Sequence, residues 1–361
     1  MKKAKVAILK TSSKTIISDY VKLCKLADLK KALNPSKKTI LKDNITWHYL
    51  YPGVNTTPWQ LEGTIQALQK NGYSDIVDVH NNTVVTNPFK GEKLNKYIPV
   101  YEKYNIPTLY NFRKDEIEWI DYEPKHKLLA LHKIYPEGIK IPKYFIDKNI
   151  IHLPTVKTHS YTTFTGALKN AFGGLLNSKR HYSHTWIHDT LVDLLAIQKE
   201  IHSGLFAIMD GTIAGSGPGP RTVIPHEKNV ILASSDMVAI DAVAAKIMGF
   251  NPMKIRCTAK AHELGLGIAD MNQIEIVGDK DIVNENWHFN VGVNLATGAG
   301  RVLWNSPLKI LQKLLFHTPL VYLFVFASAA YHDWLWYPTK GKRVVNKWIK
   351  ENQWGKLFNS Y

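Results

Sequence analysis

A polar segment near the middle of the chain carries the side chains best suited to chemistry. It follows an apolar run at 149–151 that predicts a strand ending by Pro154. A helix starting near Thr163 or Thr165 would come next and stop at the two glycines 173–174. Such a helix start favours a negatively charged ligand, because unpaired amides and the helix dipole point at it. The candidate site residues here are Lys157, His159, Thr165, Gly166, Lys169 and Asn170.

This segment predicts a pocket for an anionic substrate or cofactor. His159 is suited to proton transfer, because an imidazole titrates near neutral pH, and Lys157 lies beside it as a second catalytic candidate. Lys169 and Asn170 would bind the ligand. The alternative is a well-capped loop whose lysines are only solvated.

Two acids elsewhere are further catalytic candidates. Asp210 follows an apolar strand, 205–209, and begins a glycine-rich segment ending at Pro220. That segment lacks the GK[ST] of a P-loop and holds two prolines, so it predicts a rigid active-site loop in which Gly217 and Gly219 approach the ligand. Asp241 lies among small apolar residues of a predicted helix, either at the site or in a buried hydrogen bond that ties this helix to the glycine-rich segment.

Three histidines offer a metal hypothesis. His181, His184 and His188 are spaced i, i+3 and i+7, which places them within a narrow arc if this part is helical. Imidazoles arranged in this way bind transition metals, and Asp189 or Asp193 could support them. The alternative is ordinary hydrogen-bonded histidines ahead of a helix that begins only at Trp186.

Four ordered motifs carry a family resemblance. They are LPTVKTH (153–159), TGALKNAFG (165–173), IMDGTIAGSGPGP (208–220) and ASSDMVAIDAVAAKIMG (233–249). From about Lys42 to about Asp279 the chain resembles the prokaryotic family called domain of unknown function 362. Lys42 and Asn44 match a polar pair that the family carries after an early strand, so the resemblance places them near the site. Many members also carry ferredoxin-type cysteine clusters, which suggests redox chemistry with an external electron carrier.

A more distant resemblance is to lactate racemase-type proteins, which hold a nickel-pincer nucleotide. His159 followed after four residues by FTGALK is similar to their histidine and [FY]SGGRK segment. The resemblance implies Lys169 as the cofactor lysine, His159 as a pocket or catalytic histidine and His188 as a metal ligand. Two departures are that Ala167 and Leu168 replace the Gly-Arg of that segment, and that residues 55–58 lack the arginine of Asp-x-Thr-Arg-Pro.

The elements that must position these residues alternate between strands and helices. This order predicts an α/β fold with a mainly parallel sheet flanked by helices over 1–300, an irregular insertion at about 80–148, and a C-terminal helical, apolar tail at 301–361. Strands are predicted at 5–10, 39–45, 75–79, 205–209, 229–233 and 273–277. Helices are predicted at 17–33, 59–70, 187–201 and 257–264, at about 94–104, and after a Ser235 cap.

Composition limits the cofactor and the partners. Two cysteines in 361 residues, with no CxxC spacing, exclude a cysteine-ligated iron–sulfur cluster within the chain, so the cofactor left open is a metal or a phosphate-bearing organic molecule. The net charge of +16 fits an acidic substrate or an anionic membrane. No basic-aromatic module argues for nucleic acid. The short apolar run near the N-terminus predicts no signal peptide, and hence a cytoplasmic protein.

The tail suggests where the protein resides. Residues 314–332 contain no Lys, Arg, Asp or Glu, and tryptophans and basic residues flank them. The strongly apolar part, from Pro319 to Ala330, is short for a membrane span. We expect two helices that meet near Pro319 and dock residues 307–337 on the inner face of the cell membrane. A buried C-terminal helix or a homo-oligomer face is the alternative.

The leading hypothesis from the sequence is an enzyme attached peripherally to the membrane. It would bind an anionic or lipid-linked small molecule and catalyse redox or racemase/isomerase-like chemistry. The alternative is a non-catalytic, membrane-docked ligand-binding protein.

Overall fold

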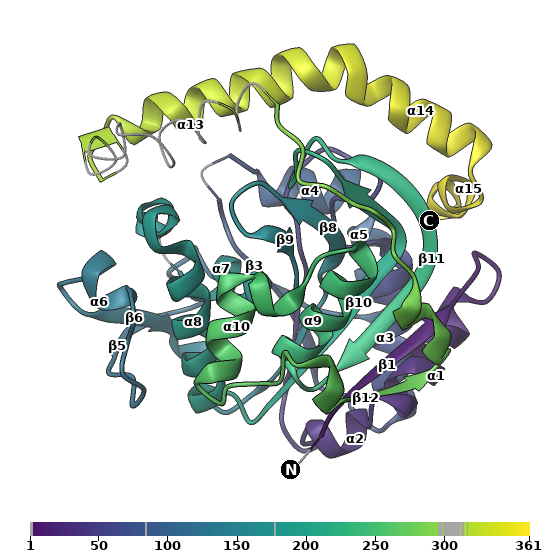
Figure 1. The fold of residues 1–361 in the computed structure, drawn as a ribbon, viewed down its shortest axis with the longest axis horizontal. Helices are drawn as coiled ribbons and strands as arrows, with labels where there is room; N and C mark the ends of the chain where they lie inside the picture. The colour runs from purple at the N-terminus through teal and green to yellow at the C-terminus, as the bar shows by residue number, and fades with distance from the viewer. Residues whose placement is uncertain are drawn as a thin grey trace.

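The computed structural model describes residues 3–83, 85–176, 178–294 and 317–361, with positions 298, 311, 314 and 315; for 178–181 it describes the backbone alone. Within these residues a ten-stranded sheet forms the centre, and helices cover both of its faces (Figure 1). The predicted α/β architecture with a mainly parallel sheet is therefore confirmed.

Eight strands form the main path of this sheet. Their order is β12 (Ile274–Gly278), β1 (Ala4–Lys10), β11 (Ile224–Ser234), β10 (Gly204–Ser216), β7 (Asn149–His152), β2 (Thr39–Lys42), β3 (Ile76–His80) and β4 (Thr108–Tyr110). Strand β11 is antiparallel to both neighbours, and the other pairs are parallel. Strand β8 (Thr155–His159) pairs with β10 and, antiparallel, with β9 (Thr163–Thr165). The parallel strands bring their carboxyl ends to one edge, where α/β proteins place their sites.

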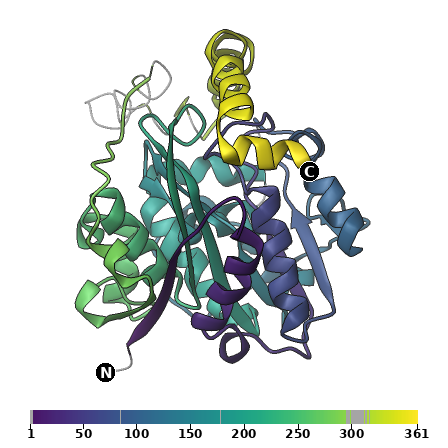
Figure 2. The same ribbon diagram turned by 90° about the vertical axis from the view of Figure 1, so that its right-hand side faces the viewer.

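Both faces of the sheet are apolar, as the alternation in β1 illustrates. Val6 and Ile8 pack on one face, and Ala7 and Leu9 pack on the other. The first face is covered by α7 (Ala167–Leu175), α8 (Ile187–Ile201), α9 (Met237–Met248) and α10 (Arg256–Glu263). The second is covered by α1 (Ile16–Leu26), α2 (Leu29–Ala32), α3 (Pro58–Lys70) and α5 (Tyr97–Tyr104), as Figure 2 shows from the side.

Several boundaries differ from the prediction. The single helix expected at 17–33 is broken at Asp28, which has a positive φ of 56°. The segment after Pro154 is not a loop but strand β8, and residues 163–165 form β9 rather than a helix start. Strand β10 continues through the glycine-rich segment to Ser216 and pairs with β11, so only the residues from Gly217 onward form the turn.

The insertion is more regular than the sequence suggested. Helices α4 (Pro88–Leu94) and α5 connect β3 to β4, which extends the parallel sheet. The remainder holds a two-stranded antiparallel sheet, β5 (Trp119–Tyr122) with β6 (Ile139–Pro142), and the short helix α6 (Leu131–Ile134).

The C-terminal segment forms one long helical rod across the end of the molecule (Figure 1). The α-helix α13 (Val321–Ala329) continues into the π-helix η7 (Ala330–Gly341) and then α14 (Lys342–Glu351), and α15 (Gln353–Ser360) follows. Pro338 lies inside η7, where the wider turn accommodates a residue without an N–H. The expected pair of helices meeting near Pro319 is replaced, in the described part, by a rod that starts just after it. Residues 301–310, 312, 313 and 316 lie outside the described residues.

One face of this rod packs on the core. The Nε1–H of Trp47 donates to Asp333 Oδ1 at 2.6 Å, and the rings of Tyr49 and Tyr337 stack at 4.1 Å. Among the described residues, no helix combines the length and the apolar character that crossing a bilayer requires.

Candidate functional site

A cavity of about 190 Å³ lies at the carboxyl edge of the sheet. The loop after β2, the loop after β3 and helix α7 form its walls. Six residues predicted from the sequence line it: Lys42, Asn44, Thr165, Lys169, Asn170 and the metal candidate His184. Asp43, Thr46, Asn81 and Pro220 contribute further polar and apolar surface. The cavity therefore joins residues from four distant parts of the chain.

Asn170 links the cavity wall to the interior. Its Nδ2 donates to the backbone oxygen of Lys42 at 2.7 Å and contacts His152 Nδ1 at 3.3 Å. The other ring nitrogen of His152 lies 2.5 Å from Gln198 Oε1, so it carries the proton and the ring is neutral. Burial lowers the pKa of His152 to about 4, with Lys42 contributing. Asn170 is thus both a lining residue and a fixed structural support.

Lys157 and His159 lie in β8, fully buried behind the cavity. Lys157 Nζ donates to Thr46 Oγ1 at 2.9 Å and to the backbone oxygen of Val54. Burial, with nearby Lys169, holds the pKa of Lys157 well below its usual range. Burial, Lys169 and His184 likewise lower the pKa of His159, whose Nδ1 accepts a hydrogen bond from the Tyr161 amide at 3.1 Å. Both side chains are buried bases whose protonation is disfavoured by burial and by neighbouring positive charge.

Asp241 occupies the helix N-terminus at which a ligand was expected. Its Oδ1 accepts a hydrogen bond from the amide of Ala167 at 2.6 Å, and its Oδ2 from that of Leu168 at 3.0 Å. A side chain on Gly166 would clash with this carboxylate, so a glycine is required there. The carboxyl group of Asp241 on α9 therefore caps the first turn of α7, and Asp241 ties α9 to α7 rather than to the glycine-rich segment.

Asp210 and the glycines pack elsewhere around the site. Asp210 Oδ2 accepts hydrogen bonds from Tyr20, Thr57 and Trp59, and its Oδ1 accepts from Thr212. This carboxylate lies on the α1/α3 side of the sheet and is outside the cavity lining. Gly217 and Gly219 lie against β8, where the Gly217 oxygen accepts from Thr158 Oγ1 at 2.7 Å and a Cβ at Gly219 would clash with the Thr158 oxygen. Of the glycine-rich segment, Pro220 lines the cavity.

The three histidines are not stacked on one α-helix. Residues 178–186 form a 3₁₀-helix, and α8 begins only at Ile187. His184 lines the cavity, whereas His188 Nδ1 accepts the amide hydrogen of Cys257 at 3.3 Å. The side chain of His181 lies outside the described residues.

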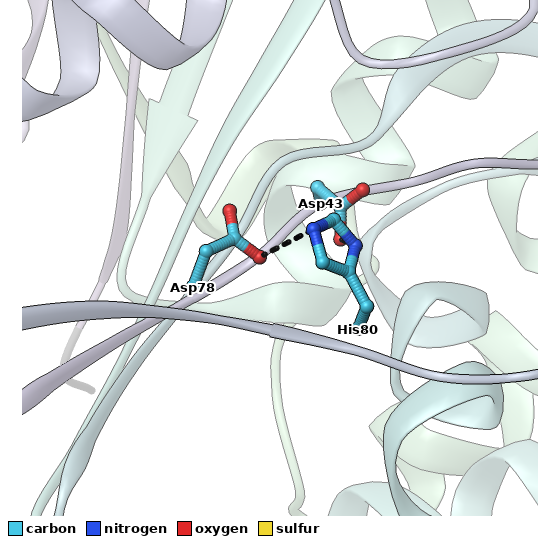
Figure 3. Close-up of side chains that lie close together, drawn as sticks. All are labelled: Asp43, Asp78 and His80. Carbon is cyan, nitrogen blue, oxygen red and sulfur yellow. Dashed lines mark ion pairs between the residues drawn. The ribbon is translucent and has the colours of Figure 1, made fainter. Parts of the chain in front are cut away.

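A second charged cluster lies beside the cavity and was not predicted. Asp43 directly follows β2, and Asp78 and His80 share one face of β3 (Figure 3). One atom from each of the three lies within 4.8 Å of the others, the only such potential metal-ligand group found in the described part of the chain. His80 Nδ1 is 3.2 Å from Asp43 Oδ1, and Nε2 is 3.8 Å from Asp78 Oδ1 and 3.5 Å from Glu92 Oε1.

Electrostatics in this cluster are strongly coupled. Burial opposes ionisation of Asp43, but His80 and Lys42 lower its pKa to about 2. Burial and Asp43 raise the pKa of Asp78 to about 7. Burial disfavours the charged form of His80, yet Asp43 and Asp78 raise its pKa to about 9. A signal for this cluster was present in the sequence, since Asp78 and His80 alternate with apolar residues in a buried strand.

Comparison with known proteins gives a family and one relative. The model of the family described as "Domain of unknown function (DUF362)" matches residues 39–246. A thylakoid-associated protein of Synechocystis sp. is similar, with 27% identity over 154 residues that cover 41% of this chain and 48% of the relative. The chain thus spans about half the length of that relative. No solved structure matches.

Proposed function

This chain belongs to the family described as "Domain of unknown function (DUF362)", and we propose that its cavity beside α7 binds an anionic small molecule. The observation that carries this proposal is the gathering of basic groups around one cavity. Lys42, Lys169 and His184 line it, the buried Lys157 donates to Thr46 of the lining, and the buried His159 lies within the electrostatic influence of Lys169. Burial lowers the pKa of Lys157 and of His159, and repulsion from the charge of Lys169 lowers both further. A bound anion would relieve that repulsion.

The same arrangement supports an enzyme more than a passive binding protein. His159 and Lys157 are buried bases with lowered pKa values, and Lys157 donates to Thr46 of the cavity lining, which suits a group that removes a proton from a bound substrate. Racemase/isomerase-like chemistry, with Lys169 and Asn170 holding the anionic group, is the reaction class we propose. Redox chemistry would require an external electron carrier. Incorporation of solvent deuterium into a bound ligand would separate catalysis from simple binding.

Ligand binding can be tested by calorimetry with inorganic phosphate and with small hydroxy-carboxylates. Lys169→Gln should weaken binding about tenfold or more, because a charged hydrogen bond contributes about 1.5–3 kcal/mol. Lys254→Gln, at an exposed lysine outside the cavity lining, is the matched control and should bind as the wild type does. Equal affinity of the Lys169→Gln variant and the wild type would refute the proposed cavity.

A second proposal is that the C-terminal rod docks the protein on an anionic membrane surface. Leu323, Phe326 and Trp334 are 66%, 60% and 68% exposed, and the rings of Phe326 and Trp334 contact each other at 5.6 Å. Burying each such side chain contributes about 1.5–3 kcal/mol. Exposed basic residues follow along the rod: Lys340, Lys342, Arg343 and Lys347. The relative named as thylakoid-associated lends this proposal support.

The rod and the cavity share one loop, which suits a lipid-linked substrate. Residues 44–46 of the loop after β2 line the cavity. Trp47, the next residue, packs against the rings of Trp336 and Tyr337 on the rod. A ligand carried by the membrane would thus meet the cavity close to the docking surface.

Flotation with liposomes tests the docking. The wild type should float with phosphatidylglycerol vesicles and much less with phosphatidylcholine vesicles. The triple variant Leu323→Ser, Phe326→Ser, Trp334→Ser should remain at the bottom of the gradient. Ile224→Ser is the matched control, because Ile224 is 57% exposed on β11. Flotation of the triple variant with the wild type would disprove docking through the rod.

A further inference from the structure

We propose that Asp43, Asp78 and His80 form a binding site for one divalent transition-metal ion, with Glu92 at its edge. This inference does not depend on the anionic ligand, because metal binding can be measured without it. The site lies where β2 and β3 end, next to the cavity that Asp43 also lines. An ion could therefore enter from the cavity, and a bound ligand could reach it.

The arrangement of the carboxylates carries the inference. Each of the three acids has one oxygen held by a donor. Asp43 Oδ1 accepts from Lys42 Nζ at 3.1 Å, Asp78 Oδ2 accepts from Tyr101 at 3.0 Å, and Glu92 Oε2 accepts from Tyr110 at 3.0 Å. The other oxygen of each, Asp43 Oδ2, Asp78 Oδ1 and Glu92 Oε1, is buried without a hydrogen-bond partner.

Unsatisfied buried carboxylate oxygens are costly, and here all three surround one imidazole. Asp43, Asp78 and Glu92 are only 1%, 0% and 5% exposed, so bulk water does not solvate them. Metal ligands in proteins show this pattern, in which one atom binds the ion and an outer hydrogen bond orients the side chain. Lys42, Tyr101 and Tyr110 would supply these outer hydrogen bonds.

The spacing is close to that of a coordination sphere. Metal–oxygen bonds of about 2.1 Å place neighbouring ligand atoms roughly 3 Å apart and opposite ones roughly 4 Å apart. The ligand atoms of Asp43, Asp78 and His80 already lie within 4.8 Å of one another, so small side-chain movements would close the site. Strand β3 fixes Asp78 and His80 two residues apart on one face, and Leu41 of β2 pairs with Asp78, which places Asp43 alongside.

Charge balance points the same way. With all three carboxyl groups ionised, Lys42 and a charged His80 would leave one negative charge in excess. A divalent ion that replaces the imidazole proton neutralises the group completely. Imidazole with carboxylates favours Mn²⁺, Fe²⁺ or Zn²⁺ over Mg²⁺ and Ca²⁺, which prefer oxygen alone. The two cysteines, Cys24 and Cys257, lie in the packed cores outside this cluster.

The test is metal titration of the full chain after chelation. Mn²⁺ binding followed by electron paramagnetic resonance, and Zn²⁺ binding followed by calorimetry, should give one ion per chain. Asp78→Asn and His80→Gln should each lower the affinity at least about tenfold, and Tyr101→Phe about tenfold through the lost outer hydrogen bond. His202→Gln, at a buried histidine outside the cluster, is the control and should bind normally.

A second measurement needs no variant. X-ray absorption of the Zn²⁺-loaded wild type should show a single imidazole with oxygen ligands. Several imidazoles or a sulfur ligand would place the ion elsewhere and overturn the inference. The inference is also overturned if the wild type binds no metal, or if the folded Asp78→Asn and His80→Gln variants bind the metal with unchanged affinity. The cluster would then be an internal ion pair around a protonated imidazole.

Discussion

The carboxylate of Asp241 lies 2.6 Å from the amide nitrogen of Ala167, so an acid in the middle of α9 caps the first turn of α7. The two residues are 74 positions apart, and the Gly166 that precedes α7 offers no side chain for the task. The neighbouring cavity borders α7 along its side, through Lys169 and Asn170, and not at its end.

Removing this carboxylate should destabilise the protein. Asp241→Ala leaves the buried amides of Ala167 and Leu168 without acceptors, and we expect a loss of about 2–4 kcal/mol in the free energy of unfolding. Urea denaturation measures this loss. Asp270→Ala is the matched control, because Asp270 caps a solvent-exposed turn and should cost about 1 kcal/mol or less. Similar losses in the two variants would show that the buried cap stabilises the fold no more than an exposed one does.

Asp241 should also make stability depend on pH. Burial raises its pKa to about 7 in the folded protein, above the roughly 3.9 of an unfolded chain. The folded state binds more protons between these values. The contribution is therefore complete below about pH 4 and is lost as the pH rises to about 7, by at most about 1.4 kcal/mol per pH unit. Asp241→Asn cannot titrate, so the difference in stability between wild type and variant should change with this slope. A difference independent of pH would contradict the shifted pKa.

The sheet was predictable because its strands are apolar runs between turn residues. The local sequence misled where buried polar side chains interrupt that pattern. The sequence of strand β8, with Lys157 and His159, favours a loop, since a fully buried lysine contradicts the ordinary preference of charged groups for water. Its partner β9 consists of threonines and a phenylalanine that also suit a helix cap.

The sequence motifs predict five residues of the cavity lining, but they do not predict the cluster around His80. The family resemblance points to Lys42 and Asn44 at the end of β2, but it assigns no role to Asp43 between them, which also lines the cavity. Asp78 and His80 lie on β3, which pairs with β2 although the two strands are far apart in the sequence. The spacing of residues along the chain does not reveal that pairing. For Asp241 the sequence offers a buried hydrogen bond, but to the glycine-rich segment, because spacing along the chain does not show that α7 packs beside α9.

The neutral ring of His152 should make the protein sensitive to acid. Its pKa is lowered by burial to about 4, below the roughly 6.5 of an unfolded chain. The folded state therefore binds fewer protons between these values, and the stability contributed is lost as the pH falls from about 6.5 to about 4, in total about 3 kcal/mol. His152→Gln should lose less stability than the wild type over this range in urea titrations. His132→Gln, at an exposed histidine, should follow the wild type.

The hydrogen bond from Trp47 to Asp333 should hold the C-terminal rod on the core. Trp47→Phe keeps most of the aromatic packing but removes the Nε1–H donor, leaving a largely buried carboxylate with His48 Nε2 at 3.7 Å. We expect the rod to open more often, by a factor of about ten or more, because a hydrogen bond to a charged group contributes about 1.5–3 kcal/mol. Hydrogen exchange of the amides in η7 measures that opening. Trp119→Phe removes a comparable bond, to the Asn111 oxygen in the insertion, and should leave exchange in η7 unchanged. If the two variants exchange alike in η7, the rod is held by its ring contacts, such as Tyr49 on Tyr337, and not by Asp333.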